Sequence, residues 1–79
     1  MIVGVLFFGS TAEITGQRRI AIEVATETRA STIFSKLVAD HPRLAAHKLH
    51  FSVNQQFATG NEIICDGDEL AIFTAVSGG

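Results

Sequence analysis

The sequence has 79 residues, of which 47% are hydrophobic and 18% are charged. This length fits one small domain, and the high apolar content predicts that a partner covers part of its surface. The net charge of −2, without a basic stripe, argues against nucleic-acid binding. The N-terminal apolar stretch is too short to span a bilayer and has no positively charged leader. We therefore expect a cytoplasmic protein that binds neither nucleic acid nor a membrane.

The first predicted element is a strand over residues 2–8 that is apolar on both faces. Its alternate residues form one face with Val3, Val5 and Phe7 and another with Leu6 and Phe8. We predict that the first of these faces points into the core, because Gly4 on the other face would leave a gap there. Two apolar faces are typical of a central strand whose second face is also covered, by the domain itself or by a partner.

Residues 10–24 predict a short helix followed by a second strand. Ser10 and Glu13 have the spacing of a capping box, and Gly16 can end the helix in a left-handed conformation. Residues 19–24 alternate between apolar and polar side chains, which predicts a half-buried antiparallel strand.

Residues 28–40 change to the period of a helix. The apolar stripe consists of Ala30, Ile33, Phe34, Leu37 and Val38. This spacing predicts an amphipathic helix that packs one stripe on a sheet. We expect Thr28 to cap its start and the His41-Pro42 pair to end it.

The last third of the chain predicts further strands. Residues 49–53 alternate, Asn54-Gln55 forms a turn, and residues 56–58 return as a short strand. A tight turn at residues 66–68 starts the final strand, which covers residues 69–76.

In that final strand we predict that Phe73 and Ala75 face outward. Phe73 would then form an aromatic patch with Phe8, if the first and last strands are neighbours. The element order, ββαββ, predicts an α+β architecture with one main helix on one face of a mixed sheet. A β-grasp fold has this order, with the first and last strands paired at its centre. We expect a single domain over residues 1–79 with a flexible tail over residues 76–79.

Catalytic motifs are absent from the sequence. His41, His47 and His50 do not match a metal-ligand spacing, so we expect no metal site. Cys65 lies in an apolar run, which predicts a core position rather than a nucleophile. The acidic side chains of Asp66, Asp68 and Glu69 could suggest a carboxylate pair or a cation site, but Gly67 between them indicates a turn, which explains them more simply. The chain is therefore not expected to be an enzyme that works alone.

The C-terminal residues Val76, Ser77, Gly78 and Gly79 suggest a different chemistry. Fully extended, these four residues reach about 13 Å, and two glycines can pass through a narrow channel. A carboxylate becomes electrophilic once it is adenylated, and it can then accept sulfur, a thiol or an amine. We therefore expect the Gly79 carboxylate to be the reactive group, activated by another protein.

An ordered set of motifs resembles the MoaD family, the small subunits of molybdopterin synthase. The motifs are Val5-Leu6-Phe7-Phe8, Ala12-Glu13-Ile14-Thr15-Gly16, His41-Pro42, Val53-Asn54-Gln55, Asp66-Gly67-Asp68-Glu69 and Val76-Ser77-Gly78-Gly79. The resemblance implies a ubiquitin-like β-grasp fold. It also implies that Gly79 is adenylated by an ATP-dependent activating enzyme (MoeB-like) and converted to a thiocarboxylate.

By the same resemblance, the sulfur passes to cyclic pyranopterin monophosphate on a large, MoaE-like subunit of a heterotetrameric synthase. The tail would insert into that subunit, and the chain itself would bind no cofactor. The expected docking surface consists of Leu6, Phe8, Phe73 and Ala75. One departure is Thr74-Ala75, where MoaD chains often carry two prolines.

Two alternatives to the MoaD assignment remain open. One is a related carrier, similar to ThiS, that serves thiazole or cysteine synthesis or tRNA thiolation. The other is a ubiquitin-like binding domain with a chemically silent tail, for which removal of Gly79 would leave function intact.

Overall fold

The computed structural model of the protein describes residues 1–74. Its elements are β1 (Ile2–Phe7), α1 (Ser10–Thr15), β2 (Arg19–Glu23), α2 (Ala30–Asp40), the 3-10 helix η1 (Pro42–Ala46), β3 (Leu49–Val53), β4 (Gln56–Phe57) and β5 (Glu69–Thr74). The bounds from β1 to α2 and those of β3 and β4 agree with the predicted elements to within about two residues at each end. The predicted end of the last strand, at residue 76, lies outside the described residues. The 3-10 helix η1 was not among the predicted elements.

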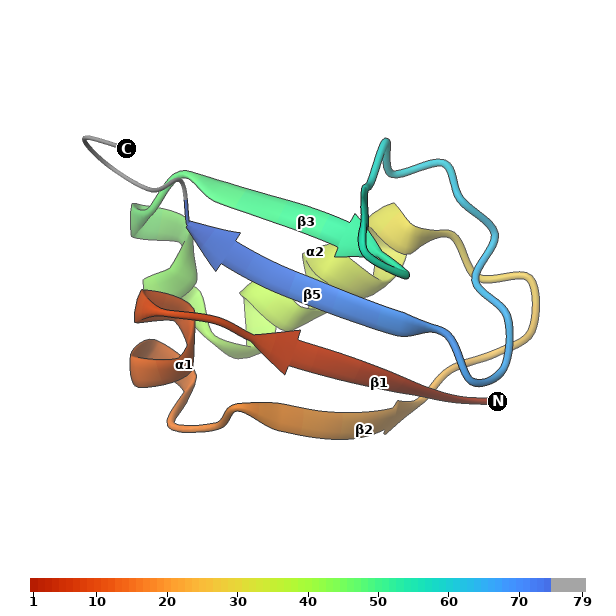
Figure 1. The fold of residues 1–79 in the computed structure, drawn as a ribbon, viewed down its shortest axis with the longest axis horizontal. Helices are drawn as coiled ribbons and strands as arrows, with labels where there is room; N and C mark the ends of the chain where they lie inside the picture. Colours follow the sequence, from red (N-terminus) through yellow and green to blue (C-terminus); the bar gives the residue numbers. More distant parts are fainter. Residues whose placement is uncertain (75–79) are drawn as a thin grey trace.

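The strands form one mixed sheet with the order β2-β1-β5-β3-β4. The two central strands, β1 and β5, are parallel, and Val5 is paired with Leu70. Their outer neighbours β2 and β3 each run antiparallel to them (Figure 1). The sheet and its one long helix confirm the predicted α+β, ubiquitin-like β-grasp fold.

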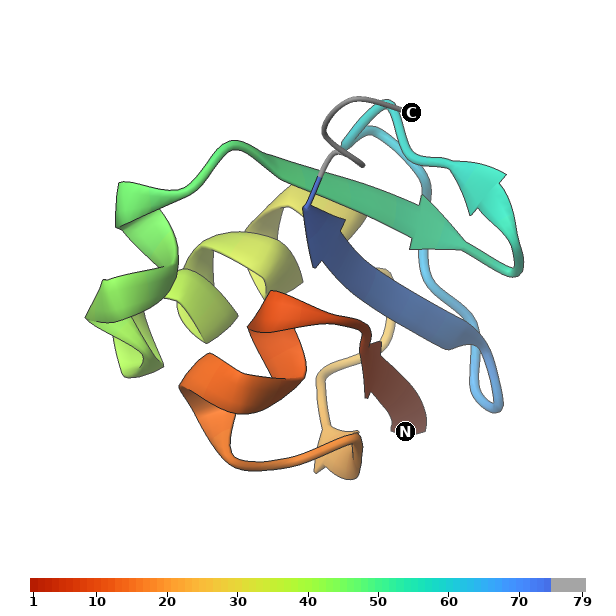
Figure 2. The ribbon, with the colours of Figure 1, turned by 60° about the vertical axis from the view of Figure 1, so that its left-hand side comes forward.

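The core lies between one face of this sheet and α2. In Figure 2, α2 and η1 lie on one side of β5 and β3. The buried cluster is formed by Val3, Val5, Phe7, Ala30, Ile33, Phe34, Leu37, Ile64, Leu70 and Ile72. Each large side chain of this kind contributes about 1.5–3 kcal/mol by leaving water. The inward assignment of Val3, Val5 and Phe7 is confirmed, since their exposed fractions are 0%, 0% and 2%.

The long helix begins differently from the prediction. Thr28 does not cap α2, because its hydroxyl donates to the carbonyl oxygen of Ala25 at 2.6 Å. The first helical N–H groups instead donate to backbone carbonyls of a distant loop, Ala30 to Glu62 at 2.9 Å and Ser31 to Gly60 at 3.0 Å. The helix ends at His41, as the following proline predicted.

The short helix α1 also lacks the predicted capping box. Its N-cap residue is Gly9, and no side chain caps it. Ser10 is already helical, and its hydroxyl contacts the hydroxyl of Thr74 at 3.1 Å. The predicted end is confirmed, since Gly16 adopts a left-handed conformation with φ of 72°.

Candidate functional site

The predicted reactive tail lies outside the described residues. This holds for Ala75, Val76, Ser77, Gly78 and Gly79. The structure instead defines the strand from which the tail continues and the surface around it.

The end of β5 is attached to α1 and to the residues before it. The N–H of Phe8 donates to the carbonyl oxygen of Ile72 at 3.1 Å. The fully buried hydroxyl of Thr11 lies 2.9 Å from the same oxygen and 2.7 Å from the carbonyl oxygen of Phe8. Thr74, where MoaD chains often carry a proline, pairs in register with Leu49 of β3. We call the segment 72–74 the tail root.

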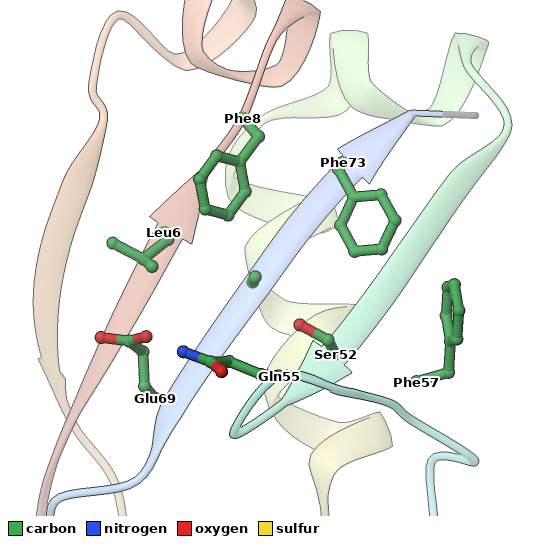
Figure 3. Close-up of a pocket in the computed structure, with 8 residues that line it drawn as sticks. Leu6, Phe8, Ser52, Gln55, Phe57, Glu69 and Phe73 are labelled. Atoms are coloured by element: carbon green, nitrogen blue, oxygen red, sulfur yellow. The ribbon is translucent and has the colours of Figure 1, made fainter. Parts of the chain in front are cut away.

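The face of the sheet opposite α2 carries a shallow depression of about 280 Å³. It is lined by Leu6, Phe8, Ser52, Gln55, Phe57, Glu69, Ala71 and Phe73. We call it the outer-face groove. Figure 3 shows Leu6 and Phe8 on the β1 side and Phe73 on β5. The predicted outward patch of Phe8 and Phe73 is therefore present, while Ala75 is outside the described residues.

Two rings in this region were missed by the sequence analysis. Phe57 is 75% exposed, and its ring centroid lies 5.9 Å from that of Phe73. The ring of His50 stacks on Phe73 at 5.8 Å and meets Phe57 edge-on at 6.2 Å. The signal for His50 was available, because the alternation of residues 49–53 places it on the outward face. Phe57 is brought there by its pairing with Ser52.

An ion pair borders the groove at the start of β5. Arg19 on β2 reaches across β1 to Glu69 on β5, with 3.8 Å between the guanidinium nitrogen and the carboxylate oxygen. The guanidinium group passes over Gly4, because a Cβ atom there would lie 3.6 Å from Arg19 Nη2. Since both side chains are substantially exposed, this pair contributes little to stability. Its effect is to give an apolar groove a charged edge.

The other candidate groups do not assemble into a site. Among residues 1–74, no group of three His, Cys, Asp or Glu side chains could hold a metal ion. The predicted core position of Cys65 is wrong, because Cys65 is exposed and only its neighbour Ile64 is buried. The carboxylate of Asp68 accepts the Cys65 N–H at 2.7 Å and that of Asp66 accepts the Ile2 N–H at 2.8 Å. These acids therefore hold a turn.

One carboxylate has a shifted pKa, and it lies away from the groove. The N–H of Thr59 donates to Glu62 at 2.7 Å and that of Gly60 at 2.9 Å. Hydrogen bonds from the backbone, that of Thr59 first, lower the pKa of Glu62 from its ordinary value of 4.5. The carboxylate orders the loop whose carbonyls receive the first N–H groups of α2.

The described part of the chain includes no helix of the length and apolar character needed to cross a membrane.

Comparison with known proteins identifies the family. The profile of the ThiS family matches residues 5–79. The chain is 35% identical to the human molybdopterin synthase sulfur carrier subunit, across 98% of this chain and 93% of that protein. It is 32% identical to small archaeal modifier protein 1 of Haloferax volcanii, across 91% of this chain and 94% of that protein.

Solved structures agree on the fold. A crystal structure of small archaeal modifier protein 1 from Haloferax volcanii superposes with a TM-score of 0.86 at 27% identity, covering all of both chains. A complex of subunits 1 and 2 of the molybdopterin-converting factor from Helicobacter pylori includes a chain with a TM-score of 0.71 at 21% identity, also over the full length of both. With the full-length sequence matches, these likenesses show that the chain belongs to the ThiS/MoaD family of β-grasp sulfur carriers.

Proposed function

We propose that this chain is the sulfur-carrier small subunit of molybdopterin synthase. The carboxylate of Gly79 is adenylated by an ATP-dependent activating enzyme and converted to a thiocarboxylate. The thiocarboxylate then donates its sulfur to cyclic pyranopterin monophosphate, held by the large synthase subunit, to build the dithiolene of molybdopterin. The chain is the sulfur donor of the complex and does not act alone.

The activation proceeds in three steps, each with a defined leaving group. A carboxylate oxygen of Gly79 attacks the α-phosphorus of ATP, and pyrophosphate leaves. A persulfide sulfur then attacks the acyl carbon, and AMP leaves with the former carboxylate oxygen. A thiol finally cleaves the sulfur–sulfur bond, which leaves one sulfur on Gly79 and forms a disulfide with the donor. Because Gly78 and Gly79 have no side chains, they leave the acyl carbon accessible in a narrow site.

The proposal is carried by the observation that β5 contributes a side chain to the groove and directly precedes the tail in the sequence. Phe73 belongs to the outer-face groove, and the chain continues from the next residue, Thr74, toward Gly79. A partner that docks on the groove therefore lies beside the origin of the tail. The similarity to the human sulfur carrier subunit supports this assignment, as does the complex of two subunits seen for the Helicobacter pylori protein.

The first experiment measures the intact mass of the untagged chain after incubation with ATP, a MoaD-activating enzyme and a persulfide source. We expect a mass increase equal to the replacement of one oxygen by sulfur. A variant that lacks Gly79 is the control, and it should fold but show no increase. The product is then mixed with a large synthase subunit and cyclic pyranopterin monophosphate, and molybdopterin formation is followed.

The outcomes distinguish molybdopterin synthesis from sulfur carriage for another pathway and from the absence of sulfur carriage. A mass increase with molybdopterin formation supports it fully. A mass increase without molybdopterin, alongside a known small subunit that succeeds, leaves a carrier for thiazole or cysteine synthesis or tRNA thiolation. An unchanged mass under conditions that convert a known carrier would overturn sulfur carriage and favour a binding domain with a silent tail.

A second candidate function is protein modification. The observation that favours it is the likeness to small archaeal modifier protein 1, which is close to that of the human relative in identity and extends over the full fold. An amine of another protein would attack the acyl carbon of the same acyl adenylate. An amide bond would form at Gly79, and AMP would leave. Covalent adducts of the chain that persist under reducing, denaturing conditions would indicate this route, and a thiocarboxylate alone would not.

A further inference from the structure

The tail root is connected to α1 by a side-chain contact between two hydroxyl groups. The hydroxyl groups of Ser10 and Thr74 lie 3.1 Å apart, are partly buried and come from positions 64 residues apart in the chain. Thr74 is the last residue that the structure describes, and residues 75–79 follow it in the sequence. The contact therefore lies at the last described residue of β5, next to the proposed reactive tail.

Helix α1 does not depend on this serine for its own start. The N–H groups in the first turn of α1 already have backbone acceptors. The N–H of Thr11 donates to the carbonyl oxygen of Phe8 at 3.2 Å, and that of Ala12 donates to the carbonyl oxygen of Gly9 at 3.1 Å. A serine at this position ordinarily hydrogen-bonds within its own helix terminus. Here the Ser10 hydroxyl is directed to β5 instead. Its contribution is therefore made to the tail root rather than to the helix.

The surrounding contacts hold the end of β5 from both of its sides. The carbonyl of Ile72 is held by the N–H of Phe8 and lies within hydrogen-bonding distance of the Thr11 hydroxyl. Thr74 is paired to Leu49 on the other side of β5. The hydroxyl contact with Ser10 adds a bond from the α1 side at Thr74, the last residue that the structure describes. The root is thus held from both neighbouring elements.

We propose that Ser10 is a positioning residue that acts through Thr74 to set the direction in which the tail leaves the sheet. The inference rests on the proposed function, in which Gly79 must enter the active site of another protein. Five extended residues reach about 17 Å, so a small rotation at Thr74 displaces the end of the tail by several ångströms. A root that is already ordered loses less conformational entropy when the tail enters an active site.

The test compares variants that remove or keep the hydroxyl pair. Thr74→Val and Ser10→Ala remove it, while Thr74→Ser keeps a hydroxyl at the same position. Ser35→Ala, an exposed serine on α2, is the control for loss of a hydroxyl elsewhere. For each variant, kcat/KM for thiocarboxylate formation is measured by intact mass. Thermal unfolding and the backbone amide order parameters of residues 74–76 are measured in parallel.

We expect Thr74→Val and Ser10→Ala each to lower kcat/KM about three- to tenfold, the range that corresponds to one hydrogen bond. The double variant should be no slower than either single variant, because both remove the same contact. Thr74→Ser should stay near the parent rate, and the rate losses should persist at temperatures at which every variant is fully folded. The order parameters of residues 74–76 should fall in both hydroxyl-deleted variants.

Several outcomes would overturn the inference. These are an unchanged rate in Thr74→Val, an equal loss in Thr74→Ser, or a rate loss that only follows a lower melting temperature. If the parent chain is never converted to a thiocarboxylate, the proposed function fails instead. The order parameters then decide the positioning role alone, because unchanged values in Ser10→Ala would refute it.

Discussion

Asn54 and Glu69 exchange two hydrogen bonds between the β3–β4 turn and the start of β5. The N–H of Asn54 donates to the carbonyl oxygen of Glu69 at 2.7 Å, and its side-chain oxygen accepts the N–H of Glu69 at 3.0 Å. The side-chain nitrogen of Asn54 also donates to the carboxylate of Asp68 at 3.1 Å. This asparagine has a positive φ of 49°, which asparagine tolerates better than most residues. One side chain therefore connects two turns that are far apart in the sequence.

We predict that Asn54→Ala lowers the free energy of unfolding by about 1–2 kcal/mol. The substitution removes both side-chain hydrogen bonds and places alanine at a positive φ. Urea denaturation measures the loss. Gln56→Ala, at an exposed neighbour on β4, serves as the control. Asn54→Gly relieves the backbone strain and should recover part of the loss; equal stability of all three variants would contradict the connecting role.

The outer-face groove gives a prediction about binding. Phe73→Asp should raise the Kd for the proposed partner, the large synthase subunit, at least about tenfold, because it places a charge in the centre of the proposed apolar docking surface. Phe57→Asp should act in the same direction with even less effect on folding, since Phe57 is 75% exposed. Calorimetry measures the affinity, and Ser35→Asp adds the same charge to α2 as the control. Unfolding of the free Phe73→Asp domain would show instead that Phe73 stabilises the core.

Substitution of Gly4 tests whether β1 has room for a side chain beneath the guanidinium group of Arg19. Gly4→Ala should raise the free energy of unfolding by about 0.5 kcal/mol, because alanine loses less backbone entropy than glycine in a strand. The added Cβ atom would meet the guanidinium group of Arg19 at 3.6 Å, which is an ordinary contact distance. Gly4→Leu should displace Arg19 from Glu69. A loss of stability in Gly4→Ala, measured by thermal unfolding, would disprove this account.

The lowered pKa of Glu62 predicts that this residue contributes to stability in a pH-dependent way. Because hydrogen bonds from the backbone lower its pKa below 4.5 in the folded state, the ionised carboxylate stabilises the fold above that pH. This stability is lost as the pH falls through the folded-state pKa. Glu62→Gln should therefore be less stable than the parent near neutral pH, and the difference should shrink below pH 4.5.

Urea midpoints measured across this pH range test the prediction. Glu23→Gln is a matched control, because within residues 1–74 the Glu23 carboxylate makes no ion pair or hydrogen bond. A Glu62→Gln deficit that stays constant with pH would rule out the ionised carboxylate as its cause.

The arrangement of strands and core could be predicted from the sequence because side-chain periodicity reports it directly. Val5 and Leu70 alternate with outward residues, and both are fully buried. Gly16 and the turn at Gly67 were also predictable, since each has the positive φ that glycine favours. These features depend on residues that are close together in the chain.

The helix starts and the position of Cys65 could not be predicted, because distant segments determine them. The first N–H groups of α2 bond to the carbonyls of Gly60 and Glu62, which makes a local cap at Thr28 unnecessary. Cys65 follows Ile64 in an apolar run that is not a regular strand, so no alternation indicated which side chain is buried. The two-residue strand that places Phe57 beside Phe73 is likewise too short to give a pattern.

The central position of β5 makes both the sheet and the outer-face groove depend on the last strand to be synthesised. A nascent chain that has not reached residues 69–74 lacks the strand between β1 and β3, so it has two unpaired inner edges and no closed core. It also lacks Phe73, and with it the middle of the outer-face groove. Incomplete chains therefore lack the proposed docking surface. The complete sheet therefore requires synthesis of every residue up to those that directly precede the tail.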